Sequence, residues 1–128
     1  MGFEKVFLFG ALGDRLDHTF GNLMLLKNYQ GKVVIIDKDI QIVCINECYT
    51  LNLKGRAGSV ISMFSIDDPS PKIITEGLKY NLLNKKLFFT THGLSNELKE
   101  ESASITLNGK GDVLVFVNKN INMQIIVK

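Results

Sequence analysis

Short apolar runs separated by turn residues recur along most of this chain. Some runs alternate apolar and polar positions and others are continuous, and both patterns predict strands. The turns recur every 8–12 residues or so, a spacing typical of β-sandwiches and barrels. The expected strands cover residues 32–37, 40–46, 48–53, 59–66, 72–76, 78–82, 86–90, 102–107, 113–117 and 123–127.

The first forty residues follow a different pattern. An apolar strand at residues 6–9 leads into a glycine turn at 10–13 and then an amphipathic helix that stops before Gly31. On that helix we expect Leu16, Phe20 and Leu23 to pack inward. The order strand, helix, strand resembles the tail of an α/β domain whose earlier part is absent.

The predicted fold is therefore mainly β: an antiparallel β-sandwich (jelly-roll-like) preceded by a short strand–helix remnant of an α/β domain. The expected domains are 1–37 and 38–128, with the boundary near residues 37–46. Three local features refine the prediction. Gly77 suggests a bulge or kink, Asn84-Lys85 a turn, and the polar stretch 91–98 an ordered loop.

Composition and charge narrow the function classes. The chain has 128 residues, about one domain's worth, with 45% hydrophobic and 22% charged residues, so it is globular. Its net charge is +2 and its lysines are dispersed, which does not favour nucleic-acid binding. No apolar run approaches the roughly 18 residues of a membrane span, and no secretory signal opens the chain.

The two cysteines, Cys44 and Cys48, do not predict a disulfide or a metal site. On one extended segment they would lie roughly 13 Å apart, too far for a disulfide. With only His18 and His92 besides, they form no zinc pattern. We expect free, half-buried thiols in a reducing cytoplasm.

The glycine turn carries the candidate chemistry. A helix that opens after such a turn presents unpaired N–H groups and a positive dipole end, which suits an anion. Arg15 can grip phosphate with its planar fork, and Asp17 can hold magnesium or position a hydroxyl. Asp14, His18 and Asn22 fall on one stripe of the helix. The same residues equally fit a solvated helix face with a surface ion pair, because a Gly-x-x-Gly turn is a weak signal.

Three segments, in this order, resemble the thiamine pyrophosphokinase family. Residues 9–18 with Asn22 are similar to its Gly-x-x-Gly-x-Arg-x-Asp-His motif, which ends the nucleotide-binding domain. Residues 75–82 are similar to its Thr-x-Gly-Leu/Phe-Lys-Tyr-x-Leu strand. Residues 93–97 are similar to its Ile-Ser-Asn-Glu loop. The resemblance that they carry covers essentially the whole chain.

The resemblance implies transfer of pyrophosphate from ATP to thiamine, giving thiamine diphosphate and AMP, by a cytoplasmic homodimer that uses Mg²⁺. Arg15 and Asp17 would be catalytic, with Arg15 meeting phosphate and Asp17 the one candidate metal ligand. Ser95, Asn96 and Glu97 would contact the thiamine aminopyrimidine, and Glu97 has bracing its loop as an alternative role. His18 is a further substrate-binding candidate, with a structural role as its alternative.

The chain also departs from the family pattern. It lacks the early glycine-rich segment and the Gly-Asp-x-Asp-Ser and Asp-x-x-Lys-Thr-Asp motifs that hold magnesium and ATP. The expectation is that it supplies mainly the thiamine-binding side and is inactive alone. The competing hypotheses are a non-enzymatic β-sandwich module that binds a ligand or partner, and an oligomerisation domain. The first of these would leave Arg15 and Asp17 as a surface ion pair, and in the second the strands would supply an interface.

Overall fold

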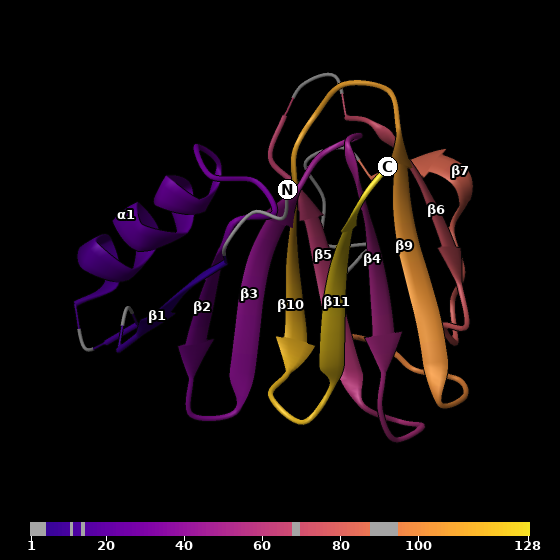
Figure 1. Ribbon diagram of the computed structural model, residues 1–128, viewed down its shortest axis with the longest axis horizontal. Coiled ribbons are helices and arrows are strands. Elements are labelled where there is room, and N and C mark those ends of the chain that lie inside the picture. The colour runs from indigo at the N-terminus through magenta and orange to yellow at the C-terminus, as the bar shows by residue number, and fades with distance from the viewer. Residues whose placement is uncertain (1–4, 11, 14, 68–69, 88–94) are drawn as a thin grey trace.

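The fold is a two-layer β-sandwich with one helix at its edge (Figure 1). The computed structural model describes residues 5–10, 12–13, 15–67, 70–87 and 95–128. Within these ranges the elements are β1 (Val6–Phe9), α1 (Leu16–Leu26), β2 (Val33–Asp37), β3 (Ile40–Ile45), β4 (Tyr49–Lys54), β5 (Val60–Ser65), β6 (Lys72–Glu76), β7 (Leu83–Lys86), β8 (Asn96–Glu97), β9 (Ser102–Asn108), β10 (Val113–Asn118) and β11 (Asn122–Val127).

The strands form two sheets. The six-stranded sheet has the order β1-β2-β3-β10-β5-β8, and the five-stranded sheet has the order β11-β4-β9-β6-β7. Among the described strands, β1 and β2 are the one parallel pair, which α1 connects, and the other pairs are antiparallel. Figure 1 shows β11, β4 and β9 in front of β10 and β5, with α1 at the left beside β1 and β2.

The main core fills the space between the sheets. Alternate residues of the central strands point into it, as in β9, where Ala103, Ile105 and Leu107 are buried and the residues between them are not. Burying an Ile, Leu or Val side chain contributes about 1.5–3 kcal/mol, so this alternation fixes which face of each strand turns inward. The prediction of a mainly β, antiparallel sandwich is confirmed.

A second, smaller core lies on the outer face of the six-stranded sheet. Leu26 of α1 packs there with Ile35, Ile42, Cys44 and Leu114, and Leu23 contacts the same cluster. The prediction that Leu16 and Phe20 pack inward is wrong, since they are 80% and 61% exposed. The helix residues that pack on the sheet are Leu23 and Leu26, so the packed face shares Leu23 with the predicted stripe but is turned away from Leu16 and Phe20.

Two predictions between β6 and β9 are also wrong. Residues 78–82 do not form a strand, since Leu78 makes one isolated bridge to Leu98 and the chain then bends. Asn84 and Lys85 lie within β7, where Asn84 has a φ of 60° beside a register shift in the β6–β7 pair. The polar stretch predicted as a loop contains β8. Residues 68–69, 88–90 and 91–94 of the predicted loops and strand lie outside the described residues.

Candidate functional site

The glycine turn before α1 is held by one side chain of the helix. Gly10 has a φ of 69°, a conformation that suits glycine. The N–H of Gly13 donates to the Thr19 hydroxyl at 3.1 Å, and the N–H of Thr19 makes the first helical hydrogen bond, to the carbonyl of Arg15. The turn and the first helical turn are therefore tied together. The sequence pattern did not identify Thr19 as a residue that holds this turn.

Arg15 and Asp17 form an exposed, two-point ion pair at this helix start. Arg15 Nη2 lies 2.8 Å from Asp17 Oδ2, and Arg15 Nε donates to Asp17 Oδ1 at 3.3 Å. Their side chains are 68% and 65% exposed. Such a pair adds little stability, roughly 0–1 kcal/mol, so an incoming phosphate can displace the carboxylate from the guanidinium at small cost.

His18 and Asn22, the other helix residues singled out from the sequence, are placed differently. His18 is exposed, whereas Asn22 is half-buried on the side of the sheet. Asp14, the third member of their stripe, lies outside the described residues, as does His92. A shallow hollow next to the glycine turn is lined by Leu12, Gly13, Asp37, Lys38, Asp39 and Ile40.

The second and third motifs come together at the other edge of the six-stranded sheet. The N–H of Lys79 donates to the carbonyl of Glu97 at 2.9 Å, and the N–H of Lys99 donates to the carbonyl of Gly77 at 2.8 Å. Gly77 has a φ of 80°, and a Cβ there would collide with the carbonyl oxygen of Ser102. The bent segment 77–82 is thus fastened along β8.

Side chains of the two motifs complete this junction. Asn96 is buried, and its Oδ1 accepts from the N–H of Tyr80 at 3.1 Å and of Glu97 at 2.9 Å. Its Nδ2 donates to the carbonyl of Tyr80 at 2.7 Å. On the far side of the bend, Thr75 Oγ1 and Asn81 Oδ1 lie 3.1 Å apart and accept the N–H groups of Leu82 and Leu78. A predicted strand becomes a bend because these side chains replace the ladder hydrogen bonds.

Ser95 and Tyr80 are two of the exposed residues of this junction. Ser95 has a φ of 59°, uncommon for a residue with a side chain, and its N–H donates to the hydroxyl of Ser62 at 2.9 Å. The Tyr80 ring is 65% exposed, and the Lys79 ammonium lies 5.5 Å from its centre. Glu97 is half-buried. Gly93 and Leu94 of the third motif lie outside the described residues.

The structure does not bring the Arg15 group and the Ser95 group together within one chain. β1 and β8 are opposite edges of the six-stranded sheet. Five interstrand steps of ~4.8 Å separate them by roughly 24 Å. Arg15 follows β1 and Ser95 precedes β8, so each group belongs to its own edge.

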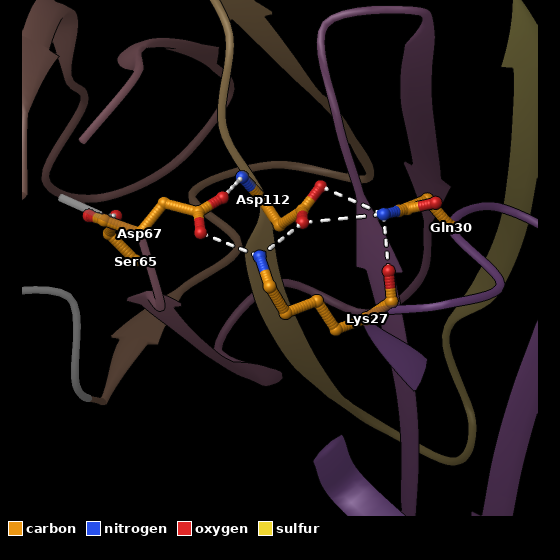
Figure 2. A network of polar contacts seen from close by, with 5 residues as sticks. All are labelled: Lys27, Gln30, Ser65, Asp67 and Asp112. Carbon is orange, nitrogen blue, oxygen red and sulfur yellow. Dashed lines mark hydrogen bonds and ion pairs between the residues drawn. The ribbon is translucent and has the colours of Figure 1, made fainter. Parts of the chain in front are cut away.

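A polar network that the sequence did not reveal joins α1 to the sandwich (Figure 2). Lys27 Nζ lies 2.6 Å from Asp67 Oδ1 and 2.7 Å from Asp112 Oδ2. The N–H of Asp112 donates to Asp67 Oδ2 at 2.6 Å, and the Gln30 amide donates to Asp112 and to the carbonyl of Lys27. Partners so far apart in sequence leave no local pattern.

The network shifts the ionisation of its members. Burial alone would lower the pKa of Lys27, but the hydrogen bonds with Asp112 and Asp67 outweigh burial and raise the pKa. Burial alone would raise the pKa of Asp67, but the hydrogen bonds from Lys27 and from the Asp112 main chain lower it. The nearby Cys44 thiol is buried, which raises its pKa to about 12 and makes it unreactive.

The described residues contain no group of three His, Cys, Asp or Glu side chains that could hold a metal ion. Cys44 and Cys48 are both free thiols, the first buried and the second exposed. No helix in the described part of the chain is long and apolar enough to cross a membrane.

Comparison with known proteins supplies the family context. Residues 42–111 match the family model described as thiamin pyrophosphokinase, vitamin B1 binding domain. Thiamine pyrophosphokinase 3 of Oryza sativa subsp. japonica is 30% identical over 116 residues, which are 85% of this chain and 43% of that protein. Thiamine pyrophosphokinase 1 of Arabidopsis thaliana is 34% identical over 112 residues, or 82% of this chain and 40% of that protein.

The fold is also similar to solved structures. The thiamine pyrophosphokinase from Bacillus subtilis superposes with a TM-score of 0.79 at 24% identity, covering 90% of this chain and 55% of that chain. The thiamin pyrophosphokinase family protein from Enterococcus faecalis gives 0.73 at 23% identity, covering 88% and 55%. The chain therefore spans about two fifths of the curated relatives and about half of these solved chains.

Proposed function

This chain belongs to the thiamine pyrophosphokinase family, and we propose that it forms the thiamine-binding side of an enzyme that makes thiamine diphosphate. In the proposed reaction the hydroxyethyl oxygen of thiamine bonds to the β-phosphorus of ATP. The bond between the α,β-bridging oxygen and that phosphorus breaks, so AMP leaves, and the hydroxyl proton passes to solvent or a base.

The observation that carries the proposal is the rigid junction between residues 75–82 and β8. It lies within the matched domain, and the exposed Tyr80 is held there by Asn96, the residue that follows the hydroxyl-bearing Ser95. An aromatic face suits stacking on a flat pyrimidine, and neutral donors and acceptors suit its amino group and ring nitrogens. We assign Ser95 as the direct contact, with Tyr80 as a wall of the pocket.

The structure gives a reason to assign Asn96 differently from Ser95. Asn96 Oδ1 already accepts two main-chain N–H groups and Nδ2 already donates to the Tyr80 carbonyl. A buried amide used in this way positions its neighbours rather than the ligand. We therefore propose that Asn96 and the main chain of Glu97 hold the junction in shape, with the Glu97 carboxylate remaining a candidate contact.

We propose that Arg15 and Asp17 act on the phosphate side. Phosphoryl-type transfer needs positioning and charge neutralisation, and the Arg15 fork fits a phosphate group. His18, exposed on the same helix, remains a substrate-binding candidate. We propose that the complete enzyme binds ATP and Mg²⁺, with Asp17 as the carboxylate this chain would offer.

We propose a homodimer, and the separation of the two groups supports it. The roughly 24 Å between the sheet edges is too long for one thiamine to span, so we propose that Arg15 of one protomer works with Ser95 of the other. The exposed apolar side chains of the β1–α1 region, among them Phe9, Leu16 and Phe20, suit packing against the nucleotide-binding domain of the same enzyme. The predicted division at residues 37 and 38 would separate that region from the sandwich.

A non-enzymatic ligand-binding sandwich is the second candidate, and one observation favours it. It requires Arg15 and Asp17 to be a surface ion pair, and they form one here. For either candidate we propose a location in the cytoplasm, a compartment in which free thiols such as Cys44 and Cys48 persist.

One experiment separates the two candidates. The full-length gene product is incubated with ATP and magnesium, with and without thiamine, and AMP is measured. AMP formation that depends on thiamine supports the enzyme. A folded full-length product that binds thiamine without forming AMP would support the binding module.

A further inference from the structure

One link between α1 and the sandwich is ionic. Lys27 directly follows α1, and its ammonium lies between the carboxylates of Asp67 and Asp112 (Figure 2). Asp67 follows β5, and Asp112 immediately precedes β10. One side chain thereby joins three segments that are distant in sequence.

The surroundings make this link stronger than the ion pair at the other end of the helix. Asp112 is buried, and the residues close in sequence to the network members include Leu26 and Leu114 of the second apolar core, to which Cys44 also belongs. Charges partly withdrawn from water attract each other more strongly and are screened less by salt. The side chains of Arg15 and Asp17 are instead largely exposed to water, so their attraction is weaker and more strongly screened.

The apolar contacts of α1 are also concentrated toward its C-terminal end. Leu26 is fully buried and Leu23 contacts the second core, whereas Leu16, Asp17 and His18 are exposed. The helix has eleven residues, about 16 Å in length. An anchor at one end therefore sets where Arg15 lies at the other.

We propose that Lys27, Asp67 and Asp112 form an ionic clamp that positions α1, and through it Arg15 and Asp17, for the phosphate side of the reaction. Lys27 is in this sense a positioning residue, because it acts through the helix. The role rests on the proposed function, while the anchoring of α1 can be tested without it.

The test uses Lys27→Met in the full-length enzyme, which keeps the aliphatic stem and removes the charge. Lys32→Met, an exposed lysine in the turn after α1, is the matched control. We expect kcat for thiamine-dependent AMP formation to fall tenfold or more, since a misplacement of about 1 Å can cost roughly 10²-fold. The KM for thiamine should stay within about twofold, and Lys27→Arg should recover most of the kcat.

Hydrogen exchange provides the second measurement. Amides of α1 should exchange faster in Lys27→Met, while those of β9 and β10 keep their protection. The double variant Lys27→Met/Asp112→Asn removes the leftover carboxylate repulsion and should show the same α1 exchange if the missing link is the cause. Unchanged kcat with faster α1 exchange would overturn the positioning role, and unchanged exchange would overturn the clamp itself.

The two levels of the hypothesis fail in different ways. If the wild-type enzyme forms no thiamine-dependent AMP, the proposed function fails and the positioning role fails with it. The exchange measurement still decides whether Lys27 anchors α1, because it requires no turnover.

Discussion

The side-chain amide of Asn96 bonds the main chain of Tyr80 at both of its polar groups, 3.1 Å to the N–H and 2.7 Å to the carbonyl. This pair of hydrogen bonds reproduces what a neighbouring strand would supply. It joins two sequence motifs into one rigid surface, although sixteen residues separate the partners.

Replacing Asn96 by Ala should therefore damage both stability and thiamine binding. The partly buried N–H and carbonyl of Tyr80 would lose their partners, at a cost of up to about 1–3 kcal/mol each where water does not reach them. Urea unfolding measures the loss. Asn108→Ala, which removes one exposed hydrogen bond to Asn84, should change stability by no more than ~0.5 kcal/mol. Equal effects of the two variants would contradict the assignment.

Gly77→Ala should be among the more destabilising single substitutions in this region. The residue has a φ of 80°, and a Cβ would collide with the carbonyl of Ser102. Gly58 has a φ of 91° with open space around it, so Gly58→Ala isolates the backbone cost, about 1–2 kcal/mol. Thermal unfolding of both variants should place Gly77→Ala clearly lower. Similar melting temperatures for the two variants would mean that the junction shifts to make room for the added methyl group.

Arg15→Ala and Asp17→Ala should each reduce turnover of the full-length enzyme strongly with little loss of folding. Their side chains are exposed and their ion pair contributes at most about 1 kcal/mol, so the folding transition should barely move. Initial rates of AMP formation test the first point and circular dichroism the second. Turnover at the wild-type level in both variants would remove these residues from the mechanism.

Ser95 can be examined with two substitutions that separate its backbone from its hydroxyl. Ser95→Ala keeps the unfavourable φ of 59° and removes the hydroxyl, whereas Ser95→Gly removes the hydroxyl and relieves the backbone. Both should weaken thiamine binding more than ATP binding in calorimetric titrations. Ser95→Gly should be the more stable of the two. An equal loss for thiamine and ATP would argue against a pyrimidine contact.

The pH dependence of stability should carry the signature of Asp67. Its pKa in the folded protein is lowered from 3.8, mainly through its bonds to Lys27 and Asp112, which outweigh burial. The stabilisation is therefore complete above about pH 4 and is lost as pH falls through the lower, folded pKa. Asp67→Asn should flatten this acid limb in urea unfolding series. At high pH the raised pKa of Lys27 gives the opposite sign, with stability lost as pH rises through it.

Much of the fold was predictable because local patterns dictate it. The alternation of Ala103, Ile105 and Leu107, followed by the turn at 108–112, specifies the β9–β10 region without tertiary information. The strand at 33–37 was predictable in the same way, since a short, continuous apolar run is typical of a buried strand.

What could not be predicted depends on residues that meet only after folding. Residues 78–82 have the alternation of a strand, but Thr75, Asn81 and Asn96 supply the hydrogen bonds of a bend instead. Leu16, Phe20 and Leu23 have the spacing of one helix face. The sheet packs against Leu23 and Leu26 instead, which leaves Leu16 and Phe20 exposed. Lys27 and Asp112 are 85 residues apart, so no sequence window contains their contact.

The mixed pairing of the six-stranded sheet restricts how this protein can move. Hydrogen-bonded strands run without interruption from β1, through β2 and β3, to β8, so no flexible linker joins the helix side to the sandwich. Hinge motion needs a few residues that absorb large backbone rotations, and a continuous ladder offers none. The edge strands β1 and β8 must therefore keep an almost constant separation within a chain. Any closure around a substrate would have to come from loops or from movement of one protomer or domain relative to another.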